Sequence, residues 1–219
     1  YPADDQARAL RAVEAAADAV ETRLVGLALQ QGALEGPRNL AMALANLTAI
    51  ITGASSGLGA EFARQLAPQA RALILIARRQ SELEKTRDEL LKLNPNLQVH
   101  VRVADIASDT DRQELVESIR ALPLKPNLLI NNAGMGDYGA FESADAARIS
   151  ALLNVNINGL VLLTHALLPV LQRPAGILNV SSLAASVFMP ELAIYAASKS
   201  FVTSFSEAVH IELKQQGVT

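Results

Sequence analysis

A tyrosine and a lysine stand four residues apart in the segment Tyr195-Ala196-Ala197-Ser198-Lys199. If this segment is helical, both side chains project from one face of the helix and converge on one site. A free phenol has a pKa of about 10 and is a poor base at neutral pH. A neighbouring ammonium group favours the phenolate, so the pair predicts proton transfer to or from a reacting oxygen atom. A single pair at this spacing is equally compatible with two incidental surface residues.

A glycine-rich segment could bind the phosphates of a nucleotide. The segment Thr52-Gly53-Ala54-Ser55-Ser56-Gly57-Leu58-Gly59 follows an apolar run typical of a strand and opens a stretch typical of a helix. In such a turn, backbone N–H groups and the positive helix N-terminus face a pyrophosphate, and glycines allow close backbone approach. Alone the motif is weak, because any Gly/Ser turn between a strand and a helix looks similar. The residues predicted to contact a cofactor here are Gly53, Ser55, Ser56, Gly57, Leu58 and Gly59.

Two arginines at the end of the second predicted strand bear on the choice of nucleotide. NAD-binding proteins carry an acidic side chain there for the ribose 2′-hydroxyl, but this sequence has Ala77, followed by Arg78 and Arg79. A carboxylate would repel a 2′-phosphate, whereas a guanidinium can bind it with a bidentate fork. The sequence therefore favours NADP(H) over NAD(H), with Arg78 as the preferred ligand and Arg79 as the second. In the alternative interpretation both are solvated charges at the start of a helix.

The elements that position these residues follow an alternating pattern from Leu47 onward. Short apolar runs alternate with amphipathic stretches, which is typical of βαβ units and a parallel sheet. The expected strands are Thr48–Thr52, Leu73–Ala77, Val99–Ala104, Leu128–Asn131 and Gly176–Val180. The expected helices are Leu58–Leu66, Ser81–Leu93, Asp109–Ala121, Asp145–Leu171 and Tyr195–Gln215, and Ser81 with Glu84 fits a capping box. The predicted fold class is α/β, a Rossmann-like doubly wound parallel sheet formed by residues 47–219.

The first 46 residues have a different pattern. Residues 4–31 are rich in Ala, Arg and Glu, and their apolar side chains recur at alternating spacings of three and four. This spacing forms one helical stripe of Leu10, Val13, Ala17, Val20, Leu24 and Leu27. A second short helix is expected over Asn39–Asn46. We predict an N-terminal helical extension over residues 1–46, which could dock, oligomerise, replace part of the sheet or pack as ordinary core.

Together the motifs resemble the short-chain dehydrogenase/reductase family over Leu47–Thr219. The glycine segment has the TGxxxGxG spacing of the compact members, not the TGxxGxxG of the extended ones, and Tyr195 and Lys199 match the family's YxxxK motif. The resemblance implies a catalytic set of Asn156, Ser182, Tyr195 and Lys199. In this set Tyr195 exchanges a proton with the substrate oxygen, and the serine hydrogen-bonds that oxygen. The lysine holds the nicotinamide ribose, and the asparagine holds a water connected to the lysine.

Neighbouring residues leave alternatives to two of these assignments. Ser182 is favoured over Ser181 by its spacing of thirteen residues from the tyrosine, and Asn156 over Asn154 and Asn158 by an N-x-x-G pattern. The resemblance also implies that Asp105 and Ile106 contact the adenine and that Asn131-Asn132-Ala133-Gly134 is the family's NNAG element. The residues it adds to the cofactor-binding set are Asp105, Ile106, Asn132, Ala133, Gly134, Tyr195 and Lys199.

Two loops are implied to line the substrate cleft, and their side chains suggest a lipophilic carbonyl or alcohol substrate. They contribute Met135, Tyr138 and Phe141 from one loop and Val187, Phe188 and Met189 from the other. The same side chains could instead pack on neighbouring helices. Family members continue beyond the Tyr/Lys helix with a sixth and a seventh strand, whereas this sequence ends at Gly217-Val218-Thr219. The C-terminal strands of the predicted domain are therefore expected to be missing.

The composition of the 219 residues excludes several other classes. Without any cysteine, the chain has no disulfide, zinc-thiolate site or cysteine nucleophile, and a reducing cytoplasm is permitted. A net charge of −3 gives no basic footprint for nucleic acid. No uninterrupted apolar run reaches membrane-spanning length, since Leu160–Leu171 is interrupted and too short. No metal site is expected, because no carboxylate–histidine cluster has ligand spacing. The GxSxG elbow of hydrolases is absent, and His100, His165 and His210 fall away from the motifs.

We therefore expect an oxidoreductase that moves hydride between NADP(H) and a carbonyl or secondary alcohol, with Tyr195 as general acid/base. The resemblance implies a homo-oligomer, a dimer or tetramer formed through the two long helices, and we expect a cytoplasmic location. The alternative is a non-enzymatic nucleotide-binding or scaffold module derived from the same fold.

Overall fold

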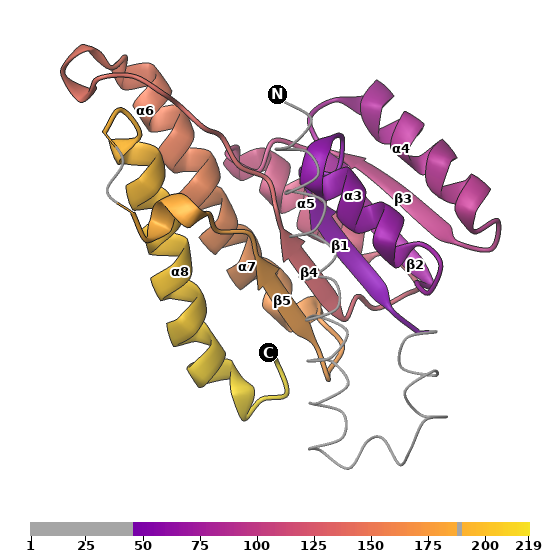
Figure 1. Cartoon of the computed structure of the whole chain (residues 1–219). Helices are drawn as coiled ribbons and strands as arrows, with labels where there is room; N and C mark the ends of the chain where they lie inside the picture. The colour runs from indigo at the N-terminus through magenta and orange to yellow at the C-terminus, as the bar shows by residue number, and fades with distance from the viewer. Residues whose placement is uncertain (1–45, 188–189) are drawn as a thin grey trace.

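Strands and helices alternate along the chain in the computed structural model, which describes residues 46–187 and 190–219 (Figure 1). The strands are β1 Thr48–Thr52, β2 Ala72–Ala77, β3 Gln98–Val103, β4 Leu128–Asn131 and β5 Gly176–Asn179. They form a parallel sheet in the order β3-β2-β1-β4-β5. Each strand begins and ends within one residue of its predicted bounds. Residues 1–45 of the predicted N-terminal extension, together with Phe188 and Met189, lie outside the described residues.

The order of the strands reverses beside β1, because β2 lies on one side of it and β4 on the other. In doubly wound sheets, ligands bind in the crevice at the carboxyl ends of the strands where this reversal occurs. The fold class predicted from the sequence is confirmed. The residues that follow β1 and β4 therefore lie at the crevice where a ligand is expected to bind.

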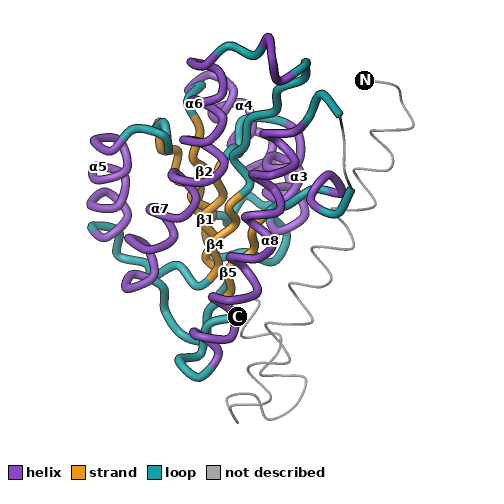
Figure 2. The backbone as a smooth tube through the Cα atoms, turned by 90° about the vertical axis from the view of Figure 1, so that its left-hand side faces the viewer, coloured by secondary structure: helices purple, strands orange, loops and turns teal. Residues whose placement is uncertain are grey.

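Helices cover both faces of the sheet (Figures 1 and 2). They are α3 Gly57–Leu66, α4 Gln80–Leu93, α5 Asp109–Arg120, α6 Ala146–Leu153, α7 Leu160–Leu167 and α8 Ala193–Lys214. Alternate side chains of a strand point to opposite faces. On β2, Leu73 and Leu75 pack with residues of α3 and α4, whereas Ile74 and Ile76 pack with residues of α5, α7 and α8. Burial on both faces explains why this strand reads as a continuous apolar run.

Helix α4 begins differently from the prediction. Its N-cap is Arg79, whose backbone is extended and whose side chain makes no capping hydrogen bond. Ser81 therefore lies inside the first turn, and Gln80 Nε2 donates to Glu84 Oε1 at 2.8 Å. The predicted capping box is wrong, because the chain turns helical directly after Arg79 and leaves Ser81 no cap position.

The long helix predicted over Asp145–Leu171 contains a π-helical turn, Asn154–Gly159, between α6 and α7. By length and composition alone the helical run Ala146–Val170 could cross a membrane. The sequence prediction missed this because it required an uninterrupted apolar run. The core helix of a globular protein meets the same criterion, and here Leu163 and Leu167 are fully buried against the sheet.

The last residues of the chain lie alongside β5. Val218 forms a parallel bridge with Ala175, Ile177 N donates to Thr219 O at 2.7 Å, and Thr219 N donates to Ala175 O at 3.0 Å. The described sheet thus has five strands and, beside β5, one isolated parallel bridge made by the last residues.

His100 on β3 is the half-buried histidine of this sheet, and its Nε2 has no hydrogen-bond partner in the part of the chain that the structure describes. Burial, with a smaller effect of the Arg102 charge, lowers the pKa of His100 below its usual value of 6.5. Between the lowered pKa and 6.5 the unfolded state binds more protons than the folded state. The stability contributed by neutral His100 is therefore present above pH 6.5 and is lost as the pH falls through the lowered pKa.

We expect the free energy of unfolding to rise with pH up to 6.5, and this rise to be smaller in His100→Leu. Urea unfolding at a series of pH values measures the slope. His165→Gln changes an exposed histidine on α7 and should keep the wild-type slope. Identical slopes in His100→Leu and the wild type would contradict the prediction.

Candidate active site

The end of β1 is joined to the end of β4 by the side chain of Thr52. Its Oγ1 accepts hydrogen bonds from Asn132 N and Ala133 N, both at 3.0 Å, and Asn132 Nδ2 donates to Thr52 O at 2.9 Å. Thr52 is fully buried. These bonds hold the glycine segment after β1 against the NNAG segment after β4.

Close packing explains why glycine is needed at two positions of this turn. Gly53 has a φ of +67°, and a Cβ added there would lie 2.7 Å from Asn132 Nδ2 and 2.9 Å from Ala133 Cα. A Cβ added to Gly59 would collide with Gly53 O and lie 2.5 Å from Asn132 Nδ2. The first turn of α3 therefore approaches the strand ends as closely as backbone atoms allow.

A cavity of about 350 Å³ lies over these strand ends, and we call it the strand-end cavity. Most of the residues predicted to bind a cofactor line it. They are Gly53, Ser55, Ser56, Arg78, Arg79, Asp105, Ile106, Asn132, Ala133 and Gly134. The wall also contains residues that were not predicted to bind a cofactor, namely Ile76, Ala77, Ala104, Met135 and Val155.

The two arginines lie at different places in the strand-end cavity. Arg78 is largely exposed and its Nη1 lies 3.7 Å from Asp105 Oδ2, a separation at which an exposed ion pair contributes little. Arg79 Nη2 donates to Ser55 Oγ at 3.2 Å and to Ser56 Oγ at 2.9 Å. Arg79 is therefore anchored on the glycine turn, whereas Arg78 stands at the adjoining strand end.

Tyr195 and Lys199 lie on the first turns of α8, as predicted, and together line a second cavity. This cavity has a volume of about 780 Å³, and we call it the tyrosine cavity. Lys199 is buried, its Nζ donates to Val180 O at 2.8 Å, and Nζ lies 5.9 Å from the centre of the Tyr195 ring. Burial lowers the pKa of Lys199, because desolvation disfavours its ammonium form.

Asn156 lies within the π-helical turn and is almost completely buried. Its Oδ1 accepts from Met135 N at 2.7 Å, and its Nδ2 donates to Met135 O at 2.9 Å. A Cβ added to Gly134 would lie 3.5 Å from both Asn156 Oδ1 and Lys199 Nζ. The structure thus brings Asn156 and Lys199 to the same space beside Gly134, whereas Asn158 donates to Asn154 on the exposed side of the helix.

The two serines after β5 have different surroundings. Ser181 lines the tyrosine cavity, and its Oγ donates to Lys199 O at 3.0 Å. Ser182 Oγ accepts from Ala184 N at 3.2 Å and so caps the short 3₁₀ turn Leu183–Ala185. In the described part of the chain, Ser181 rather than Ser182 is the serine that lines this cavity.

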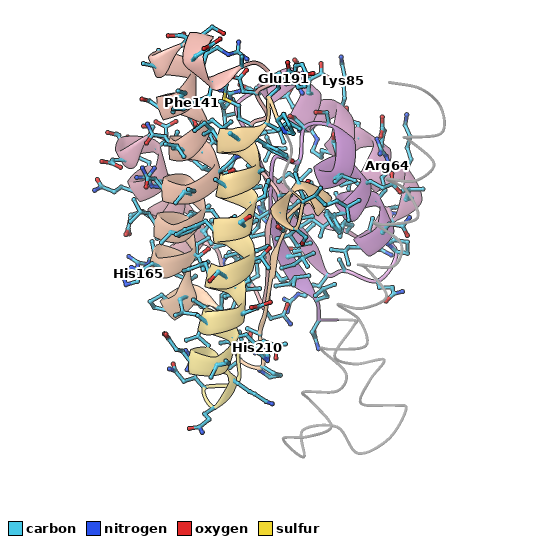
Figure 3. All side chains as sticks on the ribbon, turned by 60° about the vertical axis from the view of Figure 1, so that its left-hand side comes forward. Arg64, Lys85, Phe141, His165, Glu191 and His210 are labelled. Atoms are coloured by element: carbon cyan, nitrogen blue, oxygen red, sulfur yellow. The ribbon has the colours of Figure 1, made fainter. Side chains whose placement is uncertain are left out.

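A third cavity, of about 440 Å³, adjoins the tyrosine cavity between the start of α6 and the start of α8. Tyr138 and Tyr195 line both cavities. The rim carries charges as well as apolar groups. Arg148 Nη2 donates to Asp137 Oδ1 at 2.7 Å, and Glu191 stands at the same end of the molecule as Phe141 (Figure 3). The cleft predicted to be lipophilic is therefore mixed in character.

The three histidines contribute no side chain to these cavities within the described residues. Figure 3 shows His165 and His210 well away from Glu191 and Phe141. Across residues 46–187 and 190–219, no group of three His, Asp or Glu side chains is placed to hold a metal ion.

Comparison with known proteins decides the family. The sequence model described as short chain dehydrogenase matches residues 47–219. The chain belongs to the short-chain dehydrogenase family. Membership of this family accounts for the order of the sheet and for the positions of the glycine turn and of Tyr195 and Lys199 at its carboxyl edge.

Two similar proteins of Arabidopsis thaliana carry names that refer to 3-oxoacyl-CoA and hydroxysteroid compounds. A very-long-chain 3-oxoacyl-CoA reductase-like protein of Arabidopsis thaliana is 35% identical over 176 residues, which cover 78% of this chain and 56% of the relative. The 11-beta-hydroxysteroid dehydrogenase 1A of Arabidopsis thaliana is 38% identical over 168 residues, which cover 75% of this chain and 47% of the relative. The chain thus spans about half the length of these curated relatives.

Among solved structures, the short-chain dehydrogenase of Sphingobium yanoikuyae in complex with NADPH is similar to this chain with a TM-score of 0.72. The two chains are 30% identical, and the similarity covers 78% of this chain and 68% of the other. This likeness extends the family assignment from sequence motifs to the arrangement of the whole described domain.

Proposed function

We propose that this short-chain dehydrogenase transfers hydride between NADP(H) and a carbonyl or secondary alcohol, with Tyr195 as the general acid/base. One observation carries the proposal. The strand-end cavity and the tyrosine cavity share Asn132, Gly134 and Met135, so a single ligand can extend from the two arginines to Tyr195.

The residues of the two cavities fit a dinucleotide with a 2′-phosphate. Gly53 and Gly59 themselves have no room for a side chain, whereas a Cβ on Gly57 would meet nothing within 4 Å. Backbone N–H groups at the start of that helix suit a pyrophosphate. Arg78 and Arg79 line the strand-end cavity and could supply positive charge to an adenosine 2′-phosphate, and the solved relative bound to NADPH supports this choice.

Bound nicotinamide would supply or accept the hydride, and side chains of this chain would donate or accept the proton. In the direction of reduction Tyr195 donates its phenolic proton to the oxygen that becomes an alkoxide. The Lys199 ammonium, 5.9 Å from the ring centre, favours the resulting phenolate. Its hydrogen bond to Val180 O holds that charge at the floor of the cavity. From its spacing to Tyr195 we assign Ser182 to hydrogen-bond the substrate oxygen. Ser181, which lines the tyrosine cavity, is the alternative. Asn156 is assigned to a water that connects the lysine to solvent.

The test is NADPH consumption with a panel of aldehydes, aliphatic ketones, cyclic ketones and 3-oxoacyl thioesters. Turnover of at least one class, dependent on Tyr195, supports the proposal. Tight nucleotide binding without turnover of any class would favour the alternative, a nucleotide-binding or scaffold module. The relatives named for 3-oxoacyl-CoA and hydroxysteroid substrates support larger lipophilic carbonyl compounds as the first to examine.

We expect Arg78→Ala and Arg79→Ala each to weaken NADPH binding by about 10- to 100-fold, because a hydrogen bond to a charged group contributes about 1.5–3 kcal/mol. Affinity for NADH should change much less, since NADH lacks the 2′-phosphate. Dissociation constants for both nucleotides measure the difference. Lys85→Ala removes an exposed cation from the adjacent helix α4 and serves as the control. Equal losses of NADPH and NADH affinity would refute the role of the arginine concerned.

Two further expectations stay predictions. The homo-oligomeric state can be measured by sedimentation of the purified chain, and the cytoplasmic location by fractionation of cells that express it.

A further inference from the structure

Ser198 lies on α8 between the two residues of the YxxxK motif and is completely buried. Its Oγ donates to Tyr195 O at 2.7 Å and accepts from Asn156 Nδ2 at 3.0 Å. Ser198 lines none of the three cavities near Tyr195. The residue therefore touches the catalytic set without facing the space that a substrate or cofactor would fill.

The protons in this contact require the same orientation of the Asn156 amide as the backbone of Met135 does. A serine hydroxyl has one proton and two acceptor sites. Because the proton is directed to Tyr195 O, the oxygen of Ser198 can only accept from Asn156. The amide must then turn its nitrogen toward α8. Its second N–H reaches Met135 O, and its oxygen accepts from Met135 N.

The orientation of this amide matters at Gly134. The Asn156 oxygen keeps one acceptor site beyond its bond to Met135 N, because an amide oxygen has two. Asn156 Oδ1 and Lys199 Nζ both lie 3.5 Å from the position that a Cβ on Gly134 would take. A reversed amide would present an N–H group, instead of an oxygen, to the same space beside a buried ammonium.

We propose that Ser198 is a positioning residue that ties the Asn156 amide to α8 and thereby holds Met135 and the start of α8 in their relative places. A serine in a helix often bonds only to a carbonyl of the preceding turn, and this bond by itself positions nothing outside the helix. The second contact, to Asn156 on the π-helical turn, makes Ser198 a connection between two elements. The kinetic part of this inference rests on the proposed function.

Hydrogen exchange of the Met135 amide tests the inference without any turnover. This amide is bonded to Asn156 Oδ1. In Ser198→Ala, measured by NMR on the full chain, we expect the protection of this amide to fall by about tenfold or more. Without Ser198 the Asn156 side chain loses its bond to α8, and a tenfold change corresponds to about one net hydrogen bond. Protection of Ile50 in the centre of the sheet should not change. Ser200→Ala is the matched control, because Ser200 bonds to carbonyls of Ala185 and Ala196 but not to Asn156.

A kinetic mutant cycle provides the second measurement. With a substrate found by the panel, Ser198→Ala should lower kcat on the order of 10- to 100-fold, the effect of misplaced reacting groups, with little change in KM or in NADPH affinity. In an Asn156→Ala background the same substitution should have no further effect on kcat. Independent, multiplying effects would show that Ser198 does not act through Asn156.

The two measurements separate the two proposals. If the wild-type protein turned over no substrate, the proposed function would be contradicted. Hydrogen exchange of the Met135 amide would still test the role of Ser198. Unchanged protection of Met135 in folded Ser198→Ala would overturn the inference. If that variant does not fold, Ser198→Cys keeps the volume with a weaker acceptor. The cysteine variant should also lose Met135 protection, and full protection in it would overturn the inference.

Discussion

Replacing Tyr195 by phenylalanine should lower kcat on the order of 10²- to 10⁴-fold, the range that a general acid or base contributes. The ring remains to line the cavity and to lie beside Lys199, so the substitution removes only the hydroxyl group. NADPH affinity and the melting temperature should stay near the wild-type values. Initial rates with saturating NADPH, together with a nucleotide titration of the same preparation, measure the effect.

Tyr138→Phe provides the comparison for this prediction. Tyr138 lines the same cavity, but it is exposed and lies on the opposite loop. Loss of its hydroxyl should alter KM rather than kcat, because it acts on binding and not on proton transfer. If Tyr195→Phe retained wild-type kcat, the assignment of the general acid/base would be wrong.

Gly59→Ala should both destabilise the fold and abolish tight nucleotide binding. The added Cβ would collide with Gly53 O and approach Asn132 Nδ2, so the glycine turn must move away from the end of β4. Overpacking of this kind costs about 1–3 kcal/mol, which lowers the melting temperature by roughly 2–4 °C for each kcal/mol in a domain of this size. We expect NADPH affinity to fall by at least about tenfold. Thermal unfolding and titration measure the two effects.

Gly136→Ala is the control for the glycine prediction. A Cβ at Gly136 meets nothing within 4 Å, and the backbone there is not left-handed. Its free energy of unfolding should stay within about 0.5 kcal/mol of the wild-type value, so its melting temperature should change little. Equal effects of the two substitutions would mean that close packing at Gly59 is not what requires glycine.

The sheet was predictable because burial on both faces leaves a strong signal. Leu73 to Ile76 form a run with no polar residue, and Leu128 to Ile130 form another, as expected of central parallel strands. The carboxyl ends of β1 and β4 were equally clear, because turns rich in glycine or asparagine follow these strands. The resemblance then placed the Tyr195–Lys199 pair on the correct helix, whose i, i+4 spacing brings both side chains into one cavity.

Other parts of the site have no comparable signal in the sequence. The π-helical turn lies in an unbroken helical pattern, so its insertion, which places Val155 in the wall of the strand-end cavity, could not be located by periodicity. The tie between Arg79 and the serines of the glycine turn joins residues more than twenty positions apart. Ser198 looked like a spacer within YxxxK, and its role emerges only from its contact with a different helix.

A fluorescence titration of the chain with NADPH and, in parallel, NADH tests the central claim most directly, because it needs no knowledge of the substrate. The emission of the reduced nicotinamide is excited at wavelengths that protein side chains do not absorb, so it can be followed directly. We predict saturable NADPH binding at least about tenfold tighter than NADH binding, which corresponds to about 1.4 kcal/mol. Equal affinities would contradict the assignment of NADP(H), and no binding of either nucleotide would contradict the proposed function of this chain.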